Sequence, residues 1–261
     1  MAWNIHGELS LMLRGPDIEL IYDYDLILLQ ETWLSREEHY TLPIPDGYSI
    51  VSLPRLESLM MEGACGGVAV IYRKDVPMTV CHELSCSECM VLDFEDLTII
   101  LSYLPPWASR WLDCLEVHPH DFLEGVIAVR SLLNKLILVL GDENCCTGEL
   151  TSINEIPREL LDLVTDASGK WFVDLCKDHS LLILNGTLYD RDLPGVWTDF
   201  QYNGCSVVDY ACASISLLPH LLEFKVVDWP TRSDHAFLSV KIQSTAMAQV
   251  VRKPPKKYWE Q

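Results

Sequence analysis

The stretch that decides the fold is Leu136-Ile137-Leu138-Val139-Leu140-Gly141-Asp142-Glu143-Asn144. Its first five residues are aliphatic, and a glycine and three polar residues follow at once. A short apolar run that ends at a turn residue is typical of a strand buried on both faces. Functional side chains of α/β proteins gather where such strands end. The stretch therefore predicts a buried strand with Asp142 and Asn144 as candidate site residues.

Similar apolar runs occur on both sides of this stretch and predict further strands at 25–30, 66–72, 97–103, 207–210 and 236–240. Apolar residues at helical spacing predict two amphipathic helices, at 122–133 and 169–179. His118 and His120 flank a proline in a polar segment before the first helix, and we expect both to be exposed. Because strands outnumber helices, the pattern predicts an α/β sandwich in one domain.

We place that domain at residues 1–242 and a basic tail at 243–261. The tail carries four basic residues, Arg252, Lys253, Lys256 and Lys257, around a proline pair, which is typical of an exposed linker.

The charge of the chain limits its partners. The 261 residues include 19 Lys and Arg against 38 Asp and Glu, so the formal net charge is −19. Because 49% of the residues are hydrophobic, a disordered chain is excluded. A duplex binder that uses a broad basic surface is disfavoured, since nucleic-acid affinity usually depends on Lys and Arg. If the protein acts on phosphates, a bound metal is the candidate that would offset the charge.

The cysteines and the first residues indicate the compartment. The ten cysteines form no short-period framework of a secreted scaffold. The first residues lack the basic and apolar regions of a signal peptide, and no apolar run is long enough to cross a bilayer. We expect an intracellular protein, nuclear or cytoplasmic, with no membrane partner.

Polar residues recur at the ends of the predicted strands. In chain order they are Asn4, Glu31, Tyr103, Asp142 with Asn144, Asp209, and Asp234 with His235. A carboxylate at a strand end is more often a cap or a turn former, so each one alone is a weak signal. Together they form an ordered series, which predicts one site.

This series resembles the motifs of the endonuclease/exonuclease/phosphatase superfamily, in the same order and over about residues 2–242. Three segments narrow the resemblance to the endonuclease domain of non-LTR retrotransposons: Tyr103-Leu104-Pro105-Pro106, Leu184-Asn185-Gly186 and Gly204-Cys205-Ser206-Val207-Val208-Asp209-Tyr210. The resemblance implies a four-layer sandwich, in which two mixed β-sheets pack face to face and are flanked by helices. It also implies a metal-dependent DNA endonuclease that leaves a 3′-hydroxyl and a 5′-phosphate.

The resemblance also implies the metal site. Glu31 is a hard oxygen ligand suited to Mg²⁺, with Mn²⁺ as a substitute, and Asp234 and Asn4 would complete the surroundings of the ion. The ion would polarise the scissile phosphate and stabilise the departing 3′ oxygen.

The other residues would act on water and phosphate. Asp142 would activate the attacking water, and Asn144 would orient it and contact the phosphate. His235, held by Asp209, would donate a hydrogen bond to a phosphoryl oxygen, and so would Tyr103. Trp197 precedes the Asp209 segment and is the candidate for a groove contact with DNA.

Four features depart from the family pattern. His6 stands two residues after Asn4, where many members carry an acid, and only three residues precede Asn4. Glu143 replaces a more common aromatic residue and is expected to add negative charge beside the site. The net charge is the largest departure, and it predicts DNA binding that is weak and sensitive to salt.

Three functions remain open from the sequence. The first is the DNA endonuclease, which in the parent element would precede a reverse-transcriptase domain. The second keeps the chemistry but changes the substrate, as in a phosphatase or phosphodiesterase acting on another phosphoester; the acidic composition favours it. The third is an inactive remnant that serves as a binding module.

Overall fold

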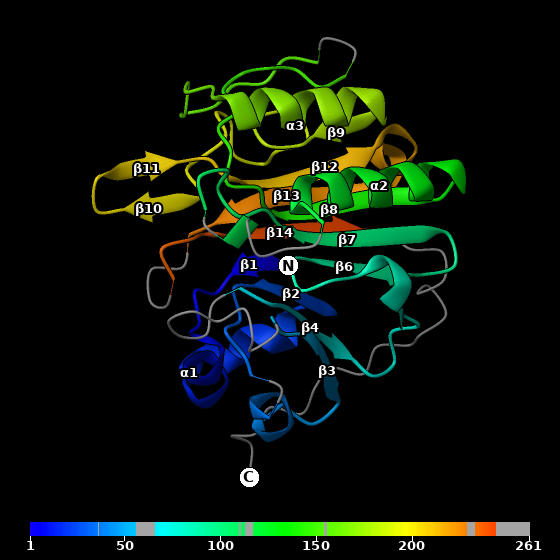
Figure 1. Cartoon of the computed structure of the whole chain (residues 1–261), viewed down its shortest axis with the longest axis vertical. Coiled ribbons are helices and arrows are strands. Elements are labelled where there is room, and N and C mark those ends of the chain that lie inside the picture. The colour runs from blue at the N-terminus through cyan, green and yellow to red at the C-terminus, as the bar shows by residue number, and fades with distance from the viewer. Residues whose placement is uncertain are drawn as a thin grey trace.

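Two six-stranded sheets pack face to face in the computed structural model (Figure 1). It describes residues 1–35, 37–55, 66–109, 111–112, 117–153, 156–228 and 233–243. The tail predicted at 243–261 therefore lies, from residue 244 onward, outside the described residues. No helix in these ranges combines the length and the apolar character that a bilayer crossing requires.

The first sheet has the strand order β13-β14-β1-β2-β4-β3. Its strands are β1 (Ala2–Asn4), β2 (Leu26–Gln30), β3 (Tyr48–Leu53), β4 (Val68–Arg73), β13 (Leu221–Val227) and β14 (Phe237–Ile242). β1 runs parallel to β2 and antiparallel to β14, so the first and last strands of the described chain are neighbours.

The second sheet has the order β5-β6-β7-β8-β12-β9. Its strands are β5 (Thr79–Val80), β6 (Cys89–Asp93), β7 (Leu97–Tyr103), β8 (Leu136–Asp142), β9 (Leu181–Ile183) and β12 (Asp209–Ser214). β7 and β8 are parallel, whereas β8 and β12 are antiparallel. Both sheets are therefore mixed.

Each sheet is apolar on both faces because one face meets the other sheet and the opposite face meets helices. Along β8, Leu138 and Leu140 enter the core between the sheets, and Ile137 and Val139 face the helices. α2 (Pro119–Leu132) and α3 (Ala167–Asp178) cover the second sheet, and α1 (Leu9–Arg14) covers the first with the 3₁₀ helix Pro16–Asp23 (Figure 1). Shorter 3₁₀ helices span Glu38–Thr41, His82–Leu84 and Ile215–His220. The expected four-layer α/β sandwich is confirmed.

A separate hairpin projects from the end of the sandwich (Figure 1). It consists of β10 (Asp199–Gln201) and β11 (Gly204–Ser206), which pair only with each other in the sheet order. Tyr202 at its turn is fully exposed.

Two local predictions are wrong. The strand expected at 207–210 begins at Asp209, because the amide of Val208 bonds to the Thr198 hydroxyl and that of Val207 to the Asp162 carboxylate instead of to a neighbouring strand. His120 is buried. α2 begins at Pro119, before the predicted start at residue 122, so His120 lies in the helix and its imidazole packs against Trp107 and Trp171. Burial lowers the pKa of His120 to about 4.

A cavity of about 970 Å³ opens between the sheets at the start of β7 and β8, where Leu97 and Leu136 line it. It extends along β8 as far as Leu140, but its lining contains none of the polar residues at the ends of these strands, so the cavity is not their site.

Candidate active site

Strand register aligns three of the predicted residues. Tyr103 at the end of β7 is paired with Asp142 at the end of β8, and Asp142 is paired with Asp209 at the start of β12. Their neighbours along the strands are buried and apolar, so the register is fixed by the core and the three polar residues fall at one edge of the second sheet.

Asn4 connects this edge to the first sheet. It ends β1, and its Nδ2 donates to Oδ2 of Asp142 at 2.9 Å and to Oε1 of Glu31 at 3.2 Å. Its Oδ1 accepts from the backbone amide of His6 at 3.1 Å, which fixes the orientation of the amide group. One buried asparagine therefore holds two carboxylates that belong to different sheets.

Asp142 is fully surrounded by donors. Besides Asn4, it accepts from the backbone amide of Asn144 at 3.0 Å and from Nδ2 of Asn144 at 2.9 Å. Burial raises the pKa of Asp142 well above its usual range, and the neighbouring Asp209 adds to the effect. A carboxylate whose pKa is raised is a stronger base than a free one.

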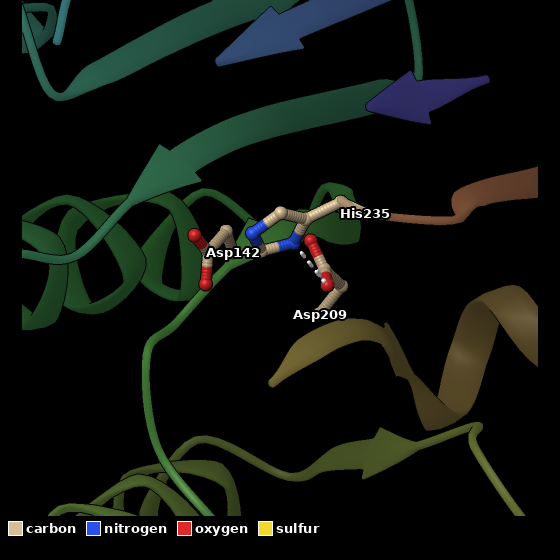
Figure 2. Close-up of side chains that lie close together, drawn as sticks. All are labelled: Asp142, Asp209 and His235. Carbon is tan, nitrogen blue, oxygen red and sulfur yellow. Dashed lines mark hydrogen bonds and ion pairs between the residues drawn. The ribbon is translucent and has the colours of Figure 1, made fainter. Parts of the chain in front are cut away.

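His235 forms an ion pair with Asp209. Its Nδ1 lies 2.9 Å from Oδ2 of Asp209, and Figure 2 shows the imidazole between this carboxylate and that of Asp142. Burial alone would lower the pKa of His235, but Asp209, together with the charges of Asp142 and Asp199, raises it to about 11. The imidazole is therefore a cation at neutral pH, and both of its nitrogens are donors.

Asp142, Asp209 and His235 form a compact group whose ligand atoms all lie within 4.8 Å of one another. Such a group could hold a metal ion, but a protonated imidazole has no lone pair to offer. Because Asp209 forms an ion pair with His235, the group of Asp142, Asp209 and His235 suits proton transfer and phosphate binding better than metal coordination.

Glu31 is a carboxylate that could contribute to the binding of a divalent cation. Its side chain accepts from two neutral groups, Nδ2 of Asn4 on Oε1 and Nε1 of Trp33 at 3.1 Å on Oε2. Neutral donors leave the negative charge of the carboxylate uncompensated. Mg²⁺ is bound in proteins by one or two carboxylates together with water and substrate phosphate, so Glu31 fits such an ion.

The surroundings of Tyr103, Asp234 and Trp197, the remaining predicted site residues, differ from one another. Burial, followed by the charges of Glu31 and Asp142, raises the pKa of Tyr103 well above its usual range, so its phenol stays protonated. Asp234 is partly buried and bonds to Nδ1 of His6 at 3.0 Å and to Nε2 of Gln201 at 2.7 Å. Trp197 is half-buried and packs against the core beneath the helices.

We expected Glu143 to add negative charge beside the site, and this prediction is wrong. Its side chain is buried behind the strand ends and accepts from the hydroxyl of Ser102. Burial raises the pKa of Glu143 to about 7. The side chains of successive strand residues point to opposite faces, which is why Asp142 and Glu143 diverge.

Three further residues support the site, and none of them is among the site residues predicted from the sequence. The hydroxyl of Thr198 accepts from the amides of Val208 and Asp209 at 3.0 Å, which fixes the start of β12. Trp33 holds Glu31, as described above. Asn185 bonds to the backbone of Asp209 with its Nδ2 at 3.0 Å. Only Asn185 lies in a segment that the sequence analysis selected.

Comparison with known proteins assigns the fold to a family. The sequence model of the Endonuclease/Exonuclease/phosphatase family matches residues 1–235. The chain belongs to this family. No curated protein matches it. The family assignment makes it a hydrolase with a phosphodiesterase or nuclease fold.

Solved structures with a similar fold superpose on nearly the whole chain. The AP endonuclease LMAP from Leishmania major has a TM-score of 0.70 and 14% identity, and the match covers 93% of this chain and 86% of that one. The 3′ phosphatase NExo from Neisseria, bound to a product DNA hairpin, has a TM-score of 0.64 and 17% identity, with coverages of 92% and 97%.

A third structure is the endonuclease domain of TRAS1, a telomere-specific non-LTR retrotransposon. Its TM-score is 0.63 at 15% identity, and the match covers 94% of this chain and 97% of that domain. At these identities the likeness shows the shared fold.

Proposed function

We propose that the chain is a Mg²⁺-dependent DNA endonuclease that leaves a 3′-hydroxyl and a 5′-phosphate. The observation that carries this proposal is Asn4, which holds Asp142 and Glu31 together while His235 and Asp209 lie beside Asp142. The proposed base Asp142, the proposed metal ligand Glu31 and the cationic donor His235 thus lie in one site.

Each side chain has a role that its surroundings support. Asp142 takes the proton of the attacking water, because its raised pKa makes it a stronger base. Asn144, which is hydrogen-bonded to Asp142, orients that water. The Nε2–H of His235 donates to a phosphoryl oxygen, and Asp209 keeps the imidazole charged and oriented through Nδ1.

Glu31 holds the ion, and Asn4 orients its carboxylate. When bound, such an ion would supply a positive charge to polarise the phosphate and to stabilise the departing 3′ oxygen. The protonated phenol of Tyr103 donates to the phosphate. Asp234 is a more distant carboxylate whose oxygens are already engaged by His6 and Gln201, so we assign it to the outer surroundings of the ion.

DNA is the substrate that the structural neighbours favour. The NExo structure contains a DNA hairpin, and the other two similar proteins are endonucleases. The projecting β10–β11 hairpin and Trp197 before it are the parts of the chain that we assign to DNA contact. We also propose descent from a retrotransposon, supported by the coverage of the TRAS1 domain and by the role of Asn185 beneath Asp209.

A supercoiled-plasmid assay tests the proposal. We expect nicking in the presence of Mg²⁺, loss of nicking with EDTA, and sealing of the nicks by a DNA ligase, which requires a 3′-hydroxyl and a 5′-phosphate. Glu31→Gln and Asp142→Asn should each abolish it, whereas Asp174→Asn, which changes an exposed carboxylate on α3, should not. Nicking that survives both site variants would remove the proposal.

The net charge of −19 favours a second candidate, a phosphatase for a smaller phosphoester. Release of inorganic phosphate from 3′-phosphorylated oligonucleotides or inositol phosphates, without plasmid nicking, would support it. The same Glu31 and Asp142 variants should then abolish phosphate release.

A further inference from the structure

The indole of Trp33 lies against the carboxylate of Glu31 in an unusual backbone turn. Nε1 of Trp33 donates to Oε2 of Glu31 at 3.1 Å. Both residues have positive φ angles, 47° for Glu31 and 51° for Trp33, a region that non-glycine residues rarely adopt. The amide of Trp33 bonds to the carbonyl of Gly66 at 3.0 Å, which helps to hold the turn. A strained turn at a site is a reason to look for a function.

The indole ring itself is fixed by its neighbours. It lies so close to Gly7 that a Cβ placed there would come within 2.3 Å of a ring atom. The imidazole of His6 packs edge-on against it with ring centroids 4.9 Å apart. The ring therefore cannot rotate away from Glu31 without displacing this loop.

Asn4 thus donates to one oxygen of the Glu31 carboxylate and Trp33 to the other, and the phenol of Tyr103 is a further hydrogen-bond partner of this carboxylate. We infer that Trp33 is a positioning residue that holds Glu31 ready for a divalent cation and so sets the affinity for that ion. The inference depends on the proposed role of Glu31 as a metal ligand. Without the indole donor, Oε2 of Glu31 loses the hydrogen bond from Trp33, so the carboxylate is less ordered before the ion binds.

The experiment removes the N–H group and keeps the ring. Trp33→Phe does so approximately. Incorporation of 3-benzothienylalanine at position 33 does so with almost unchanged shape, because sulfur replaces the indole nitrogen. Trp171→Phe, a half-buried tryptophan that packs against the core beneath α2 and α3, is the matched control. The affinity of the intact chain for Mn²⁺ is measured by calorimetry and by electron paramagnetic resonance, and Mg²⁺ titrations of plasmid nicking give the apparent metal requirement.

We expect both changes at position 33 to weaken Mn²⁺ binding about tenfold, the usual scale for a hydrogen bond to a charged group. Nicking at saturating metal should return to near the wild-type rate, since Trp33 does not touch the reacting atoms. Thermal unfolding without metal should be unchanged for the benzothienyl variant. Equal Mn²⁺ affinities for wild type and this variant would overturn the inference.

A failure of the inference is distinguishable from a failure of the proposed function. If Glu31→Gln abolishes Mn²⁺ binding and the benzothienyl variant binds normally, only the role of Trp33 is wrong. If Glu31→Gln binds Mn²⁺ as well as wild type does, the metal role of Glu31 is wrong, and the inference about Trp33 falls with it.

Discussion

Nδ2 of Asn4 lies 2.9 Å from Oδ2 of Asp142, although the two residues are 138 positions apart and belong to different sheets. The bond is buried, and it is the direct polar link between the end of β1 and the end of β8. The positions of the site residues therefore depend on how the two sheets pack against each other.

Replacing Asn4 should slow the reaction without unfolding the protein. Asn4→Ala removes one donor from Asp142 and one from Glu31, but Asn144 still holds Asp142. A hydrogen bond to a charged group contributes about 1.5–3 kcal/mol, so kcat should fall roughly 10–100-fold. Single-turnover nicking measures the rate, and circular dichroism checks the fold. Wild-type kcat in a folded variant would contradict the bridging role.

Removing the charge of Asp209 should create a new pH dependence. In the wild type, the carboxylates hold the pKa of His235 at about 11, so this residue stays charged across the neutral range. In Asp209→Asn, burial is no longer offset by this partner, and the pKa of His235 falls toward or below its ordinary value of 6.5. Activity should then decline as pH rises from about 6 to 8.

The pH profile of kcat and the imidazole resonances of His235 in NMR measure this effect. Asp199→Asn is the graded control, because Asp199 lies 3.8 Å from Nε2 and should cause a smaller shift. An unchanged profile in Asp209→Asn would show that His235 does not need its charge.

His120 should make folding stability depend on pH, away from the site. The folded pKa of this imidazole is about 4, below the ordinary value of 6.5, because of burial. As pH falls from 6.5 to about 4, His120 becomes protonated in the unfolded chain but stays neutral in the folded chain, so the free energy of unfolding decreases. His120→Gln should lack this part of the slope, and the exposed His82→Gln should retain it. Urea unfolding at several pH values decides between them.

Gly141 should tolerate no side chain. A Cβ at this position would lie 1.9 Å from the carbonyl oxygen of Ser102, which belongs to the backbone of β7 and cannot move alone. Gly141→Ala should destabilise the protein by about 3 kcal/mol. Gly125→Ala on α2 meets no atoms within 4 Å and should stabilise it by about 0.5–1 kcal/mol. Chemical denaturation compares the two, and equal effects would contradict the close approach.

Much of the fold was predictable because burial on both faces leaves a simple pattern. β2, β7 and β8 each consist of a nearly continuous apolar run and were predicted within two residues. In β13 only Phe224 and Val226 are buried, and β9 has only three residues, so neither strand gives a signal of comparable length. Short and half-exposed strands depend on their neighbours for their conformation.

The residues of the candidate site likewise divide into those with a signal in the sequence and those without one. Asp142 and Asp209 end or begin strands, and the sequence analysis selected them for that reason. Thr198 and Trp33 act through contacts that tertiary packing creates, and no spacing in the chain reveals them. Glu143 was misplaced because its side chain is buried against Ser102, and a sequence position beside Asp142 does not show which way the side chain points.

The position of β14 has a consequence for synthesis of the protein. β14 is the last described strand, yet it lies between β13 and β1, and His235 lies two residues before its first residue. A nascent chain on the ribosome already contains Asn4, Glu31 and Asp142 but cannot close the first sheet or supply the imidazole until almost all of the domain has emerged. The candidate site is therefore completed only when translation of the domain is nearly finished.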